Sequence, residues 1–178
     1  MSKAMIDIME KTIDEDYHLP RKNRDWLLAN EVKLRAPDKN SLGFSLYNED
    51  NPPFAFFKGN PPAHMAKMCD AVIAFSFKQR LYLFIIEQKT SSPGEYKKQL
   101  ANGRCFCDWL FSLYKEHEYC SEDPIYIGLL IWKPRTSPPK GETSHKNKLV
   151  PGKHHRFKHF FDEKNNRDIN LRKFIKRL

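Results

Sequence analysis

The sequence has no long hydrophobic run and no cysteine pair of the CxxC type. A membrane-spanning helix needs roughly 18 consecutive apolar residues, and no stretch of the 178 residues approaches that length. Acidic residues interrupt the N-terminal segment that a secretory signal would keep apolar. The four cysteines, Cys69, Cys105, Cys107 and Cys120, are therefore expected to be free thiols of a cytoplasmic, intracellular protein without a membrane partner.

Several motifs of common enzymes are also missing. There is no glycine-rich phosphate loop, no Ser-His-Asp arrangement and no internal repeat. A zinc site remains open as a weaker alternative, because two histidines have i, i+4 spacing, although no spacing ties the cysteines to them. Its candidate ligands are Cys105, Cys107, His154, His155 and His159.

Positive charge is concentrated in the last quarter of the chain. Residues 1–132 contain 17 Lys+Arg and 18 Asp+Glu, a net charge of −1, whereas residues 133–178 contain 14 Lys+Arg and 4 Asp+Glu, a net charge of +10. A basic segment beside a nearly neutral core indicates a polyanionic partner, most simply nucleic acid. The alternative is a solvated tail that only improves solubility.

The order of predicted elements indicates an α/β fold with a mixed central sheet flanked by helices. Helices are predicted over residues 3–16, 21–35 and 95–118, and a weak strand within 44–57. Strands are predicted over 70–77, 81–89 and 125–132, the last two parallel because a long helix connects them. We expect residues 1–133 to form the core and residues 134–178 to be a basic C-terminal extension packed on the same domain.

Charged residues end the apolar run LYLFII, which is followed by Glu87, Gln88 and Lys89. If residues 70–77 and 81–89 form a hairpin centred between positions 78 and 79, the numbers of opposed residues sum to 157. Asp70 then lies directly across from Glu87, at a Cβ separation of roughly 5 Å. Lys89 shares the face of Glu87 because side chains alternate along a strand.

Two facing carboxylates beside a lysine are the groups that metal-assisted attack of water on a phosphodiester requires. A divalent cation, Mg²⁺ or Mn²⁺, would relieve the repulsion between Asp70 and Glu87, and Mg²⁺ prefers carboxylates, waters and phosphates. Lys89 could hold a water or stabilise charge on a phosphate. The simpler interpretation is a structural salt bridge at the end of a sheet.

Asp70, then sixteen intervening residues, then Glu87-Gln88-Lys89, resembles the motif of the PD-(D/E)XK nuclease superfamily, and the order of elements over roughly residues 20–133 resembles its restriction-endonuclease-like fold. The resemblance implies that Asp70, Glu87 and the backbone carbonyl of Gln88 hold Mg²⁺ and that Lys89 positions or activates water. Many members add an acid from the first helix, for which Glu31 is the candidate. Cys69 stands where the superfamily name has proline, and Gly103 where one branch has a tyrosine four residues after a glutamine, here Gln99.

The C-terminal segment has basic residues interleaved with aromatic ones. This pattern suits phosphate contact and base stacking, and the alternative is a terminal strand whose aromatic residues complete the core. The last ten residues are predicted to be an amphipathic basic helix. The candidate nucleic-acid-binding residues are Lys153, His154, Arg156, Lys158, Arg172 and Lys173.

Together these observations predict a Mg²⁺-dependent nuclease acting in defence, repair or a mobile element, with DNA favoured over RNA on family grounds. Such a protein would be nucleoid-associated, and cutting both strands with one site would favour a homodimer. Two alternatives are a non-catalytic nucleic-acid-binding or interaction module and a nuclease subunit that is active only within a larger complex.

Overall fold

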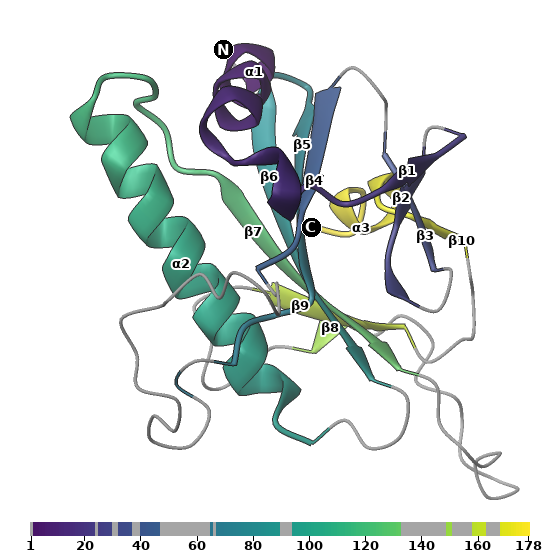
Figure 1. Ribbon diagram of the computed structural model, residues 1–178. Helices are drawn as coiled ribbons and strands as arrows, with labels where there is room; N and C mark the ends of the chain where they lie inside the picture. The colour runs from purple at the N-terminus through teal and green to yellow at the C-terminus, as the bar shows by residue number, and fades with distance from the viewer. Residues whose placement is uncertain are drawn as a thin grey trace, which may run out of the picture.

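The computed structural model describes residues 2–23, 25–29, 32–36, 40–46, 65, 67–89, 94–132, 149–150, 158–162 and 168–178. In chain order its elements are α1 (Ser2–Thr12), the 3₁₀ turn η1 (Glu15–Tyr17), β1 (Arg21–Lys22), β2 (Asp25–Leu27), β3 (Lys33–Arg35), β4 (Ser41–Phe44), β5 (Ala71–Phe77), β6 (Arg80–Lys89), α2 (Tyr96–Glu116), β7 (Ile125–Trp132), β8 (Leu149–Val150), β9 (Lys158–Asp162), β10 (Asp168–Asn170) and α3 (Arg172–Ile175). The fold is mixed α/β, as predicted (Figure 1).

Two mixed sheets organise these elements. The central sheet has the order β4-β5-β6-β7-β9-β8, and the smaller sheet has the order β1-β2-β3-β10. In the central sheet β6, β7 and β9 are parallel, while β4, β5 and β8 pair antiparallel with their neighbours. The predicted parallel pairing of β6 with β7 is therefore confirmed.

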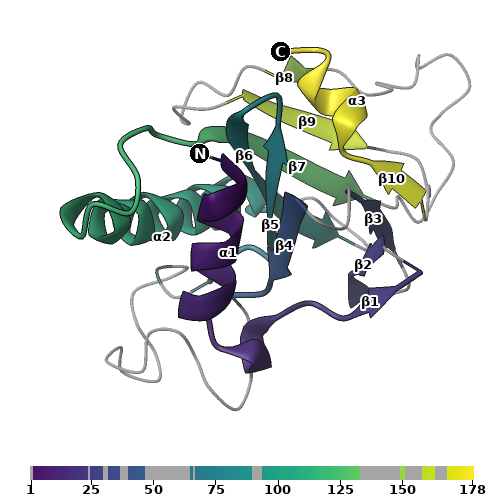
Figure 2. The ribbon, with the colours of Figure 1, turned by 90° about the horizontal axis from the view of Figure 1, so that it is seen from above.

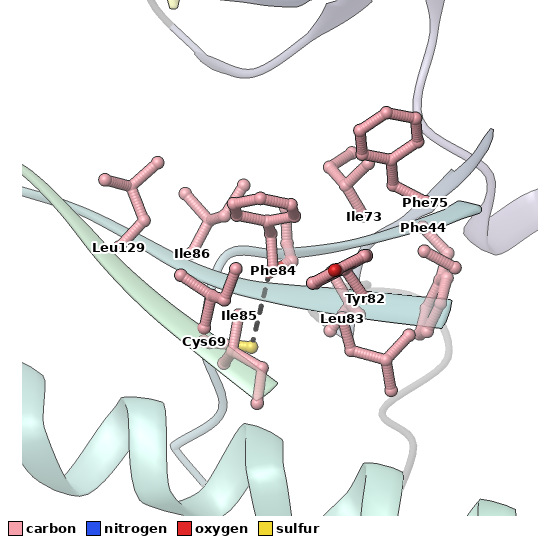
Figure 3. Packing of buried hydrophobic residues seen from close by; sticks show 14 of the residues in the cluster. Phe44, Cys69, Ile73, Phe75, Tyr82, Leu83, Phe84, Ile85, Ile86 and Leu129 are labelled. Carbon is pink, nitrogen blue, oxygen red and sulfur yellow. Dashed lines mark hydrogen bonds between the residues drawn. The ribbon is translucent and has the colours of Figure 1, made fainter. Parts of the chain in front are cut away.

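The central sheet lies between two layers (Figures 1 and 2). Helices α1 and α2 cover one of its faces, and the small sheet with α3 covers the other. On the α3 side, the rings of Phe84 and Phe174 meet at a centroid distance of 6.5 Å. Figure 3 shows Phe84 and Ile73 pointing away from α2, whereas Ile85 and Cys69 lie on the α2 side. Strand β6 is thus buried on both faces, as its continuous apolar sequence predicted.

The β5–β6 hairpin has the predicted register. Its pairs run from Ala71↔Ile86 to Phe77↔Arg80, so that the numbers of opposed residues sum to 157. The connection is the two-residue turn Lys78-Gln79, with φ angles of 49° and 61°. Positive φ at both central residues is the geometry that matches the twist of the flanking strands, although neither residue is a glycine.

The helix predicted over residues 21–35 is wrong, because this segment forms three short strands. β1 pairs antiparallel with β2, and β2 with β3, which places Trp26 beside Leu34. Val32, Leu34 and Ala36 are buried while the residues between them are more exposed, which is the period of a strand. The N-terminal helix of the fold is α1.

The last quarter of the chain contributes strands to both sheets. Strand β9 pairs parallel with β7, and β10 pairs parallel with β3. The alternative prediction of a strand in the C-terminal segment is confirmed for residues 158–162, which form β9. The predicted C-terminal helix is shorter than expected: α3 covers only Arg172–Ile175, with Phe174 buried and Leu178 44% exposed. No helix in the described parts of the chain is long and apolar enough to cross a membrane.

Candidate active site

Asp70 immediately precedes β5 and is held against β6. Its Oδ2 accepts a hydrogen bond of 2.6 Å from the backbone N–H of Gln88, and Ser45 Oγ donates to its backbone carbonyl at 2.9 Å. One step beyond the Ala71↔Ile86 pair, the hairpin register places Asp70 opposite Glu87. Burial raises the pKa of Asp70, and the Gln88 hydrogen bond and the charge of Lys89 partly offset that shift.

Glu87 is the most deeply buried charged residue of this region, with an exposed fraction of 0%. It lies on the central strand β6, opposite Leu130 of β7. Its Oε1 forms an ion pair with Lys89 Nζ, but neither carboxylate oxygen has a well-formed hydrogen bond within the described part of the chain. Burial, together with the nearby charge of Asp70, raises the pKa of Glu87 to about 7 against the opposing effects of Lys89 and of the Asp70 backbone N–H.

Lys89 connects the end of β6 to α2. Its Nζ donates a hydrogen bond of 2.6 Å to Gln99 Oε1, in addition to its ion pair with Glu87. Gln99 in turn donates from Nε2 to the backbone carbonyl of Met68 at 3.4 Å. Gln99 therefore belongs to the site although it was absent from the predicted set of site residues. The position of Gln99 in the first turns of the helix that follows the motif is the sequence signal that could have indicated this contact.

A glycine allows α2 to approach the sheet near this site. A Cβ atom added at Gly103 would overlap Cys69 Sγ and lie 2.9 Å from Ile85 Cγ2. Cys69 is fully buried directly before Asp70, and burial raises the pKa of its thiol. The helix position four residues after Gln99 is thus occupied by a close helix–sheet contact, which leaves no room for a larger side chain.

We expect Gly103→Ala to destabilise the protein by about 2 kcal/mol. The steric overlap of the added methyl group destabilises the folded state by more than the higher helix propensity of alanine stabilises it. Urea denaturation measures this change in the free energy of unfolding. The matched variant Cys69→Ala removes the overlapping sulfur, so Gly103→Ala should cost much less in that background. An increase in stability of Gly103→Ala alone would contradict the close contact.

The remaining predicted residues lie outside the described residues or on other elements. Glu31, Lys153, His154 and Arg156 lie outside the described residues, and the described segments on either side of Glu31 are the strands β2 and β3 rather than the predicted helix. Lys158 begins β9, and its side chain is not described. Arg172 and Lys173 are exposed on α3, which packs on the face of the central sheet opposite α2.

All four cysteines are free, as expected, and the described residues hold no group of three or more His, Cys, Asp or Glu side chains arranged for a metal. The Asp70–Glu87 pair nevertheless suits a hard cation such as Mg²⁺. Both Glu87 oxygens are buried without a well-formed hydrogen bond, and Mg²⁺ needs few protein ligands because it keeps several waters and binds substrate phosphates. Asp70, Glu87 and the Gln88 carbonyl are the groups that could hold it.

No family model matches the chain, and neither the curated proteins nor the solved structures include a significant match. The function must therefore be argued from the site itself.

The raised pKa of Glu87 predicts a specific dependence of stability on pH. Between its ordinary value of 4.5 and its folded value of about 7, the folded state keeps a proton that the unfolded state has lost. In EDTA, the free energy of unfolding should therefore fall as pH rises from 5 to 8, by up to about 3 kcal/mol from this group. Glu87→Gln should lack this component in denaturant titrations at both pH values, and equal slopes in the two proteins would contradict the assignment.

Proposed function

We propose that the chain is a metal-dependent nuclease of the PD-(D/E)XK type that hydrolyses phosphodiester bonds, with DNA as the favoured substrate. The observation that carries the proposal is the buried Glu87 carboxylate, whose oxygens have no well-formed hydrogen bonds although the group lies beside Asp70 and against Lys89. A buried carboxylate in this condition is costly unless it is neutralised or binds a cation.

The order of elements supports the same proposal. Helix α1, strands β4, β5 and β6, helix α2 and strand β7 match the helix, three strands, helix, strand order that the sequence resemblance implies, with β1, β2 and β3 as an addition between α1 and β4. Asp70 lies at the start of the second of these strands and Glu87 near the end of the third. Any acid contributed by the first helix would then come from α1, whose acidic residues are Asp7 and Glu10.

The carboxylates would hold Mg²⁺ or Mn²⁺, and the bound ion would polarise a phosphate oxygen and make a bound water more acidic. The hydrogen bond from Gln88 N–H fixes one oxygen of Asp70, which leaves Oδ1 for a ligand. Glu87 would release its proton when the ion binds, because metal ligands must be deprotonated.

Lys89 keeps donor capacity for the reaction. An ammonium group carries three N–H donors; in this structure Gln99 accepts one, and Glu87 is held by an ion pair without a well-formed hydrogen bond. A remaining donor could orient the attacking water or stabilise charge on the phosphate. Gln99 limits the motion of the lysine side chain, so its role is to position Lys89 rather than to contact the reacting atoms.

The second candidate is a non-catalytic nucleic-acid-binding module. The observation that favours it is that Lys89 already bridges Glu87 and Gln99, as a structural ion pair joining β6 to α2 would. On this interpretation Glu87, Lys89 and Gln99 stabilise the end of the sheet and catalyse no reaction.

The deciding experiment is cleavage of labelled plasmid, linear duplex, single-stranded DNA and RNA with Mg²⁺, Mn²⁺ or EDTA. Cutting that requires the metal would support the nuclease and identify its substrate. Salt-sensitive binding without cutting of any substrate would favour the binding module. Cutting that appears only after a cellular fraction is added would identify a nuclease subunit that requires a partner.

A further inference from the structure

Three cationic side chains converge at the end of the β5–β6 hairpin that lies farthest from the carboxylates. Lys78 Nζ lies 5.7 Å and Arg172 Cζ 5.4 Å from the centroid of the Phe77 ring. Arg80 is paired with Phe77 across the hairpin, so its side chain leaves the sheet on the same face. We call Lys78, Arg80 and Arg172 the turn cluster.

The turn cluster brings together residues that are distant in sequence. Lys78 and Arg80 belong to the hairpin, whereas Arg172 begins α3, which Phe174 anchors on Phe84. All three cationic residues are exposed. The ring of Phe77 partly stabilises the two cations near it, since a cation near an aromatic face gains about 0.5–1 kcal/mol at exposed sites.

The cations of the turn cluster lack the acidic partners that several other basic residues of the described structure have. Ion pairs within the described residues join five other exposed or half-buried Lys and Arg side chains to acids: Lys33–Asp168, Arg35–Asp25, Lys98–Glu95, Arg104–Asp108 and Lys115–Asp123. No such ion pair involves Lys78, Arg80 or Arg172 in the described part of the chain. Like charges placed together repel, so an anion that binds between them would lower the electrostatic repulsion among the three cations.

We propose that the turn cluster is a second contact surface for the phosphates of a nucleic acid, separate from the carboxylate site. The inference rests on the proposed function, because a nuclease must bind a nucleic acid, and a nucleic acid is a polyanion. Several separately placed, exposed cations suit contact with successive backbone phosphates and no sequence preference.

The position of the cluster defines the length of nucleic acid needed to reach both surfaces. Arg80 and Lys89 are the two ends of β6. At about 3.3 Å per residue, nine steps along the strand separate them by about 30 Å. Arg80 and Lys89 also lie on opposite faces of β6, because an odd number of steps separates them, so a nucleic acid that reaches both surfaces must be longer than the roughly nine base pairs that 30 Å of duplex contains. The turn cluster would thus contact a substrate well away from the bond that is cut.

The test is binding of a fluorescein-labelled 24-base-pair DNA duplex in EDTA, measured by anisotropy between 50 and 200 mM NaCl. Lys78→Glu/Arg80→Glu should weaken binding about tenfold or more at 100 mM NaCl. The slope of log K against log[NaCl] should fall in magnitude by about 2, since each lost phosphate contact contributes about 0.9. Arg172→Glu, which leaves the hairpin turn intact, should weaken binding in the same direction.

The matched control is Lys11→Glu/Lys22→Glu, which makes the same change of net charge at exposed positions on α1 and β1. Thermal melting confirms that each variant is folded. If the control weakens binding as much as the turn-cluster variants do, net charge alone explains the effect and the inference is wrong. It is also wrong if the variants bind DNA normally but lose affinity for vesicles containing phosphatidylserine.

The same assay separates this inference from the proposed function. Lys98→Ala, which removes an exposed lysine outside both surfaces, should bind the duplex as tightly as the wild type in EDTA. A protein that binds through the turn cluster but never cuts would retain the inference and refute the nuclease. If the wild type cuts DNA but the turn-cluster variants bind it with unchanged affinity, the nuclease is supported and the inference is wrong.

Discussion

Replacing Lys89 with alanine is expected to lower metal-dependent cleavage by about a thousandfold or more. Electrostatic stabilisation and proton transfer by one positioned group are each worth about 10²–10⁴ in rate, and Lys89 is the only cation paired with Glu87 in the described structure. The loss should appear in kcat more than in KM, because the group acts on the reacting centre. Single-turnover cleavage of the preferred substrate measures it.

Two neighbouring variants make this result specific. Lys98→Ala removes an exposed lysine from the same helix turn as Gln99, where it pairs with Glu95 in the described structure, and should change the rate less than twofold. Gln99→Ala removes the acceptor that holds Lys89 Nζ and should lower the rate about tenfold, with a broadened pH–rate profile. If Lys89→Ala cuts at the wild-type rate, the ion pair is structural and the proposed nuclease site is refuted.

The part of the fold around the site could be predicted because its signals are local. The run from Leu81 to Ile86 is too continuous for a half-exposed strand, and the two-residue turn at Lys78-Gln79 fixes the register of the hairpin. The register in turn places Asp70 opposite Glu87. A one-residue error in the turn would have moved every side chain of the strand to the other face.

The segment from Arg21 to Arg35 shows where local signals were insufficient. Trp26 and Leu34 are eight residues apart, a spacing that suits the face of a helix and also the face of a strand. The structure places them opposite each other on β2 and β3, and β3 is completed by β10, more than 130 residues later in the chain. The local sequence of a strand does not indicate a pairing partner that lies so far away along the chain.

The relative positions of the candidate site residues could be predicted, but the burial of Glu87 could not. The positions of Asp70, Glu87 and Lys89 followed from register and alternation, whereas the complete burial of Glu87 depends on how closely α2 packs, and therefore on Gly103 and Cys69. The participation of Gln99 depends on the same packing. Short motifs identify the residue types that a reaction needs, but the environment that shifts their pKa values is set by tertiary contacts.

The second large effect expected is a metal-dependent gain in stability that requires Glu87. At pH 8, Mg²⁺ at about 100 times its dissociation constant should stabilise the wild type by about 2.7 kcal/mol, because the ion binds the folded state and not the unfolded chain. For a chain of 178 residues this corresponds to a rise in melting temperature of about 5–10 °C. Glu87→Gln should lose this rise and lose cleavage together.

The control for this experiment is Glu95→Gln, which removes an exposed carboxylate directly before α2. It should retain the stabilisation by Mg²⁺, since that carboxylate lies outside the Asp70–Glu87 pair. At pH 5, where Glu87 is protonated, the wild type should also lose most of its response to Mg²⁺. Equal stabilisation of Glu87→Gln and wild type at pH 8 would show that the ion binds elsewhere, and the buried carboxylate would then have to be explained as a purely structural partner of Lys89.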